Sequence, residues 1–216
     1  MKAAIIGATG LVGQRLLRLL LDSDRYSEIH AIGRRKIDLD NPKLTQHIIG
    51  LDNLAGLSIN ADIDHAFCTL GTTIKQAGSP EEFQRVDRDY VCVFGELMKR
   101  LGASGLAVNS SIGADSGSAN LYLRTKGEME DCLRRCQFGT LVVVRPSLLV
   151  PTGRQEFRLG EVVAFGFFRV FGWLMQGPLR RYRPVDPRAV ARALFDGVQS
   201  PNAGIVIVQS EAVAPG

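Results

Sequence analysis

The sequence KAAIIGATGLVG, residues 2–13, decides the fold: an apolar run breaks into a glycine-rich turn, which opens an amphipathic stretch ending near Leu21. The apolar run is typical of a buried strand, and the amphipathic stretch is typical of a helix. Gly7, Gly10 and Gly13 let the backbone approach a phosphate without a Cβ in the way, and the first N–H groups of a helix bind anions. Because the turn lies where a strand meets a helix, it predicts a dinucleotide phosphate site. The alternative is that the three glycines serve only the turn and its packing.

Composition fits a single globular domain. The chain has 216 residues, of which 45% are hydrophobic, enough to bury a full core. The formal net charge is +4, and the basic excess gathers in arginines between Arg154 and Arg192. A polyanionic ligand could use that face. No block of basic residues interleaved with aromatic ones occurs, so we expect no nucleic-acid partner.

The start of the chain and its cysteines indicate a cytoplasmic protein. The first expected strand begins at residue 2, which leaves no room for a signal or transit peptide. The cysteines lack the spacing of metal ligands and are expected to be reduced thiols; they are Cys68, Cys92, Cys132 and Cys136. The longest apolar stretch, Val162–Met175, is interrupted by Arg169 and is short for a bilayer, so we expect no transmembrane segment.

Strand-like and helix-like segments alternate along the chain. Expected strands are Lys2–Ile6, Glu28–Ile32, His47–Ile49, His65–Thr69, Gly105–Asn109, Thr140–Val144 and Gly204–Val208. Expected helices are Leu11–Leu21, Ser79–Leu101, Asn120–Gln137 and Asp186–Gln199. Several strands are continuously apolar, as burial on both faces of a parallel sheet requires. The sequence therefore predicts an α/β, doubly wound parallel-sheet Rossmann fold in one domain, residues 1–216. A small substrate-side region, about 151–184, is expected where the pattern loosens.

Two arginines indicate which dinucleotide is bound. Arg34 and Arg35 follow the second expected strand, where an acid would hydrogen-bond the ribose 2′-hydroxyl of NAD. A guanidinium offers forked donors to a 2′-phosphate, so the pair favours NADP over NAD. The alternative is a solvated basic turn, with Asp38 or Asp40 supplying an acid. Farther along the chain, Gly71 lies in the turn after the strand His65–Thr69 and would permit close approach to a cofactor. The alternative is an ordinary loop, which would have a similar sequence.

A second group of residues predicts acid–base chemistry. Ser110 and Ser111 follow a strand, and Tyr122 and Lys126 share one face of the next helix because they are four residues apart. An isolated tyrosine, with a pKa of about 10, is a poor proton relay at neutral pH. A neighbouring ammonium stabilises the phenolate and can hold the nicotinamide ribose, while a serine hydroxyl holds the substrate oxygen. We expect Ser111 in that role because it lies farther beyond the strand; a solvated helix face is the alternative for Tyr122 and Lys126.

Taken together, these residues resemble the short-chain dehydrogenase/reductase superfamily, in its extended and atypical members. More specifically, the chain is similar to the Tat-interacting oxidoreductase branch in Phe67–Thr73, Val86–Val91, Ser110–Asp115, Leu121–Leu123 and Lys126–Glu128. The resemblance implies an NADP-binding Rossmann domain whose further cofactor contacts are Thr9, Leu11, Val12, Leu70, Leu149 or Val150, and Arg158. The Asn-Asn-Ala-Gly element of the larger dehydrogenases is absent, and Leu70-Gly71-Thr72 takes its place.

The leading hypothesis is an NADP(H)-dependent oxidoreductase that acts on a carbonyl or alcohol of a small-molecule substrate. Tyr122, Lys126 and Ser111 are the expected catalytic residues. A second hypothesis is an NADP(H)-binding sensor or scaffold, in which the aromatic segment Phe165–Met175 engages a protein partner or a second copy; core packing or a substrate lid are alternatives for that segment. A third is a nucleotide-sugar epimerase, against which the short region after Pro151 argues.

Overall fold

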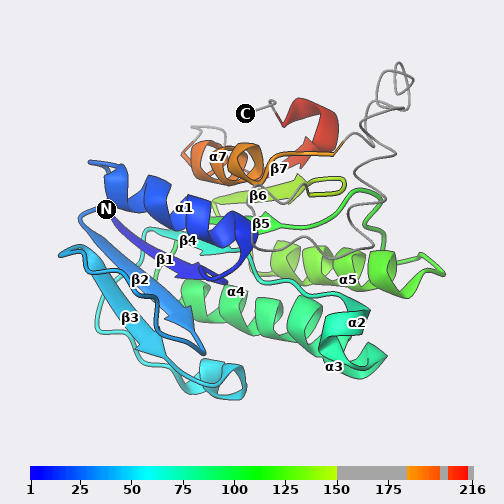
Figure 1. Cartoon of the computed structure of the whole chain (residues 1–216), viewed down its shortest axis with the longest axis horizontal. Coiled ribbons are helices and arrows are strands. Elements are labelled where there is room, and N and C mark those ends of the chain that lie inside the picture. Colours follow the sequence, from blue (N-terminus) through cyan, green and yellow to red (C-terminus); the bar gives the residue numbers. More distant parts are fainter. Residues whose placement is uncertain (150–183, 200–203, 214–216) are drawn as a thin grey trace.

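The computed structural model describes residues 1–149, 184–199 and 204–213. Within them, one parallel sheet has the strand order β3-β2-β1-β4-β5-β6-β7 (Figure 1). The strands are β1 (Lys2–Ile6), β2 (Glu28–Gly33), β3 (Leu44–Ile48), β4 (His65–Cys68), β5 (Gly105–Asn109), β6 (Thr140–Arg145) and β7 (Gly204–Gln209). The order reverses between β1 and β4, so the carboxyl ends of these two strands form the switch point where ligands bind in such sheets. The predicted doubly wound α/β fold is confirmed.

Helices cover both faces of the sheet. The α-helices are α1 (Leu11–Asp22), α2 (Ile74–Ala77), α3 (Pro80–Gln84), α4 (Tyr90–Arg100), α5 (Leu121–Arg135) and α7 (Pro187–Gly197). Short 3₁₀ helices span Leu51–Gly56 and Ser210–Ala212, and one π-helical turn spans Arg85–Asp89. Helices α1 and α7 lie side by side on one face, and α4 and α5 cover the other (Figure 1).

The strand β1 shows why its sequence is continuously apolar. Ala3 and Ile5 point into the core beneath α1 and α7, whereas Ala4 and Ile6 point into the core beneath α4 and α5. All four are fully buried. A strand covered on both faces has no polar side, so alternation disappears from its sequence.

Most expected boundaries hold. The predicted helix Ser79–Leu101 is one helical run, made of α3, the π-helical turn and α4. The strand β3 begins at Leu44 rather than His47 and pairs with β2 from Ile29 onward. It is an edge strand with a half-buried, partly polar sequence, so the apolar run alone marked too short a segment.

The expectation of four reduced cysteines is wrong for one pair. Cys92 of α4 and Cys132 of α5 form a disulfide, with their Cα atoms 6.0 Å apart. The two helices pack against each other on one face of the sheet, which brings together residues 40 positions apart in the sequence. Cys68 and Cys136 are free.

Among the described residues, no helix is both long enough and apolar enough to cross a membrane. The segment Phe165–Met175, predicted to engage a partner or cover a substrate, lies outside the described residues, as do Val150, Arg158 and most of the region 151–184.

Candidate active site

The glycine turn divides into two kinds of glycine. At Gly7, φ is +84° and a Cβ would lie 2.6 Å from the carbonyl carbon of Thr69; a Cβ at Gly13 would collide with the carbonyl oxygen of Gly7. The fold itself therefore requires these two glycines. A Cβ at Gly10 would have ordinary contact, 3.4 Å from the Gly7 oxygen, with nothing nearer. Gly10 thus leaves open a space that the protein does not fill.

The N-terminus of α1 opens at this space. Gly10 is the N-cap residue of α1, no side chain caps the helix, and no acidic residue lies in its first turn. The first N–H groups of a helix lack partners within it and carry a partial positive charge. A phosphate can therefore bind here without displacing a protein group.

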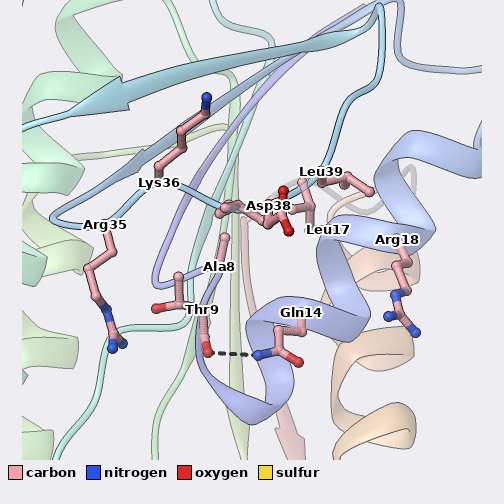
Figure 2. A pocket seen from close by; sticks show the side chains of 10 residues that line it. Ala8, Thr9, Gln14, Leu17, Arg18, Arg35, Lys36, Asp38 and Leu39 are labelled. Carbon is pink, nitrogen blue, oxygen red and sulfur yellow. Dashed lines mark hydrogen bonds between the residues drawn. The ribbon is translucent and has the colours of Figure 1, made fainter.

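Beside the turn lies a cavity of about 410 Å³ (Figure 2). It is lined by Ala8, Thr9, Gln14, Leu17, Arg18, Arg35, Lys36, Ile37, Asp38 and Leu39. The Gln14 amide donates to the Thr9 carbonyl across the turn, at 3.0 Å. Arg35 and Arg18 lie on opposite sides of α1's first turns, and Lys36 points away from Thr9 (Figure 2). Both a cation, Arg35, and an acid, Asp38, therefore border the space after β2; Arg34 is exposed next to Arg35.

The turn after β4 is fixed against the end of β1. The backbone N–H and the hydroxyl of Thr69 both donate to the carbonyl of Ile6, each at 3.0 Å. Leu70 and Gly71 follow, at the predicted cofactor contacts. A Cβ on Gly71 would lie 3.6 Å from Asp87 Oδ1 and 3.9 Å from Lys126 Nζ. The turn after β4 therefore lies directly beside the predicted catalytic lysine.

Helix α5 begins where the sequence predicted, because the Asn120 side chain accepts a hydrogen bond from the Leu123 N–H. Tyr122 lies in its first turn, with its ring stacked on Phe83 at 5.6 Å between ring centroids. Lys126, one turn later, has a side chain that is only 4% exposed.

Lys126 forms a buried ion pair that the sequence analysis missed. Its Nζ lies 2.7 Å from Asp87 Oδ1, and Asp87 Oδ2 accepts a hydrogen bond from the Thr72 N–H at 2.8 Å. Asp87 belongs to the π-helical turn and is fully buried. A signal was present, since Asp87 lies on the same helical face as the buried Phe83, Val91 and Phe94. A carboxylate on an apolar face requires a buried partner.

Charge on the lysine is maintained by this pairing. Burial opposes the charged form of Lys126, but the Asp87 carboxylate, aided by Tyr122, outweighs that effect and raises the lysine pKa. At the end of β4, burial raises the pKa of Cys68 to about 12, so its thiol stays neutral. Asp87 is thus the anionic partner of the ammonium.

The two serines after β5 have different environments. Ser110 is buried and donates to Glu130 Oε1 at 2.6 Å. Glu130, also fully buried, accepts from Arg145 Nε at 2.9 Å and from Arg145 Nη2 at 2.6 Å. Ser111 is 8% exposed and makes a 3.4 Å contact with the Ile112 carbonyl. The hydroxyl of Ser110 is therefore held by a buried carboxylate, whereas the hydroxyl of Ser111 has only a long contact with the neighbouring carbonyl.

The sheet brings the predicted residues to one edge. The carboxyl ends of the parallel strands lie at the same edge of the sheet (Figure 1). These ends are followed by the glycine turn, Arg34 and Arg35, Leu70 and Gly71, and Ser111. Leu149, after β6, forms a β-bridge with Val185 and packs against the core beneath α1 and α7.

Comparison with known proteins shows what the chain is similar to. Residues 2–84 match the family "Semialdehyde dehydrogenase, NAD binding domain". The chain is 36% identical to protein HTATIP2 of Rattus norvegicus, over 97% of this chain and 86% of that protein. It is 28% identical to the protein "FMP52, mitochondrial" of Debaryomyces hansenii, over 89% of this chain and 85% of that protein.

Solved structures share the fold at low sequence identity. A short chain dehydrogenase family protein from Francisella tularensis superposes with a TM-score of 0.66 at 14% identity, covering 98% of each chain. UDP-glucose 4-epimerase from Thermotoga maritima superposes with a TM-score of 0.69 at 14% identity, covering 97% of this chain and 77% of that one. The chain has a Rossmann-like α/β fold, and it belongs to the HTATIP2 family.

Proposed function

We propose that the protein is an NADP(H)-dependent oxidoreductase that interconverts a carbonyl and an alcohol. The observation that carries the proposal is the closeness of two predicted halves of the site: a Cβ placed on Gly71, in the turn after β4, would lie 3.9 Å from Nζ of the buried Lys126 of α5. Tyr122 is on the same helix one turn earlier. The predicted catalytic lysine and the predicted cofactor turn are therefore neighbours.

The residues present fit a dinucleotide. The space at Gly10 and the uncapped N-terminus of α1 would hold the pyrophosphate through backbone N–H groups. Gly71 would allow close approach to the ribose, where Lys126 provides N–H donors. We propose further contacts with the cofactor from Gly7, Thr9, Leu11, Val12, Gly13, Leu70 and Leu149. When bound, the cofactor supplies or accepts the hydride.

The chain's own residues would handle the proton. In the reductive direction, the Tyr122 hydroxyl gives its proton to the substrate oxygen, and the ammonium of Lys126 stabilises the phenolate that is left. The Ser111 hydroxyl donates a hydrogen bond to the same substrate oxygen and holds it beside Tyr122. In the oxidative direction the proton returns to the phenolate.

Cofactor preference follows from Arg34 and Arg35. A guanidinium beside the glycine turn offers paired donors to a 2′-phosphate, and Arg35 lines the cavity there. Asp38 borders the same cavity and would suit the 2′-hydroxyl of NAD. The arginine therefore favours NADP, and the aspartate favours NAD.

Calorimetric titration with NADPH and NADH tests this preference. We expect the wild type to bind NADPH at least about tenfold more tightly, a difference of about 1.4 kcal/mol. The double variant Arg34→Ala/Arg35→Ala should lose that preference and keep its affinity for NADH. Equal affinities in the wild type would refute the 2′-phosphate assignment.

The alternative functions gain no supporting contact from the described residues. The sensor or scaffold hypothesis depends on Phe165–Met175, outside the described ranges. An epimerase keeps its NAD bound during turnover, so protein purified without cofactor would argue against it. A cytoplasmic location and self-association stay predictions; because the FMP52 relative is named mitochondrial, cell fractionation is the required test of location.

A further inference from the structure

Asp87 has no role in the chemistry proposed above, yet its carboxylate joins two parts of the site. Oδ1 lies 2.7 Å from Lys126 Nζ, and Oδ2 accepts from the Thr72 N–H at 2.8 Å. The residue is fully buried in a π-helical turn, a distortion that is often found at functional sites. Burying a carboxylate there is costly without a specific partner.

We propose that Asp87 is a positioning residue, which holds the Lys126 ammonium and the turn after β4 together as one cofactor-binding unit. The inference rests on the proposed function, because it assigns Lys126 to the cofactor ribose. It adds that the lysine acts as one member of a neutral pair and not as an isolated cation.

The number of donors supports this role. An ammonium has three N–H donors. At most one of them points at Asp87 Oδ1, so at least two remain for a ribose hydroxyl and the Tyr122 oxygen. The second carboxylate oxygen fixes Thr72, next to Gly71, so the same side chain sets the distance between the lysine and the turn.

The surroundings of Lys126 make Asp87 the group that keeps it charged. From the elements packed around it, Lys126 is faced by Asp87 of the π-helical turn, Tyr122 of α5 and Cys68 of β4. Burial keeps the Cys68 thiol neutral by raising its pKa. If the Asp87 charge is removed, burial becomes the dominant effect on Lys126, and the lysine pKa falls.

The test uses NADPH as the probe and does not need the substrate. NADPH affinity is measured by fluorescence titration between about pH 6.5 and 9 for wild type, Asp87→Asn and Asp89→Asn. Asp89 is the matched control, because it lies two residues away, pairs with Arg88 and has a side chain 49% exposed. Wild type and Asp89→Asn should show the same shallow pH dependence.

For Asp87→Asn we expect affinity to fall by about tenfold, the size of a lost charged hydrogen bond, and to fall further as pH rises. A uniform loss at every pH would mean a structural role alone and would overturn the proposal. So would a profile that matches the wild type.

A second comparison guards against a misfolded variant. Removing both charges of a buried pair is tolerated better than removing one. If Asp87 acts through the lysine, Lys126→Met and the double variant Asp87→Asn/Lys126→Met should bind NADPH equally, within about twofold. Additive losses would overturn the proposal.

If the wild type binds neither NADPH nor NADH, the proposed function itself fails. If the wild type binds NADPH and the pH profile of Asp87→Asn matches that of the wild type, only this inference fails.

Discussion

The Ser110 hydroxyl donates a 2.6 Å hydrogen bond to Glu130 Oε1 inside the protein, at the end of β5. This bond separates two adjacent serines that the sequence could not distinguish. Ser110 belongs to a buried network with Glu130 and Arg145, whereas Ser111 makes only a 3.4 Å contact with the Ile112 carbonyl and is the serine that we propose for the substrate.

The two serines should therefore respond differently to substitution. Ser111→Ala should keep the stability of the wild type, within about 0.5 kcal/mol, and lose most turnover of any carbonyl compound that the wild type reduces. Ser110→Ala should lose about 1 kcal/mol of stability and keep more of the activity. Urea unfolding and NADPH oxidation measure the two effects; the opposite pattern would assign the substrate oxygen to Ser110.

Glu130→Gln should be destabilising without touching the cofactor. The substitution leaves the buried Ser110 and the Arg145 guanidinium without their anionic acceptor, at a cost of about 1–3 kcal/mol. The Arg145 side chain is partly exposed, so water can solvate its charge and limit the loss of stability. Asp131→Asn, on the same helix at the surface, is the control and should change stability much less. Equal effects of the two variants would contradict the prediction.

Tyr122→Phe should separate binding from chemistry. The phenyl ring keeps the stacking on Phe83, so NADPH affinity should stay within about threefold of the wild type. Proton transfer requires the hydroxyl, and turnover should fall by at least about a hundredfold. Stopped-flow or steady-state NADPH oxidation measures this; unchanged turnover would remove Tyr122 from the mechanism.

Gly10→Ala and Gly13→Ala should fail for different reasons. At Gly13 a methyl group meets the backbone of Gly7, so we expect a loss of stability of about 1–3 kcal/mol or more. At Gly10 the backbone is extended, with φ of −80°, and the new methyl group occupies the open space. That variant should fold, yet bind NADPH at least about tenfold more weakly. Thermal unfolding and titration distinguish the two; a Gly10→Ala protein with full affinity would place the phosphate elsewhere.

Acid should destabilise the fold through its histidines. Burial lowers the pKa of His30, His47 and His65 in the folded protein. The unfolded chain then binds more protons, so this stability is present above the unfolded pKa of about 6.5 and is lost as pH falls below it. The urea midpoint of unfolding should be lower at about pH 5.5 than at about pH 7.5, and His65→Gln should reduce the difference between the two midpoints. A flat profile over this range would contradict the assignment.

The sequence predicted the fold, which is confirmed, and a candidate site whose residues stay a prediction, because both sets of signals are local. Continuous apolar strands, the glycine turn and the spacing of Tyr122 and Lys126 each lie within one turn or one element. The start of β3 was misplaced because an edge strand carries a weak apolar signal. The disulfide between Cys92 and Cys132 was missed because nothing in the spacing indicates which two helices will be neighbours.

The sequence by itself determined that a buried parallel sheet is followed at one edge by a glycine turn, two arginines and a tyrosine–lysine pair. Local periodicity and backbone sterics suffice for that much. Tertiary structure decided which side chains complete the site. The pairing of Asp87 with Lys126 and of Ser110 with Glu130 depends on how separate elements pack, and a charge or hydroxyl removed from water must find its partner there.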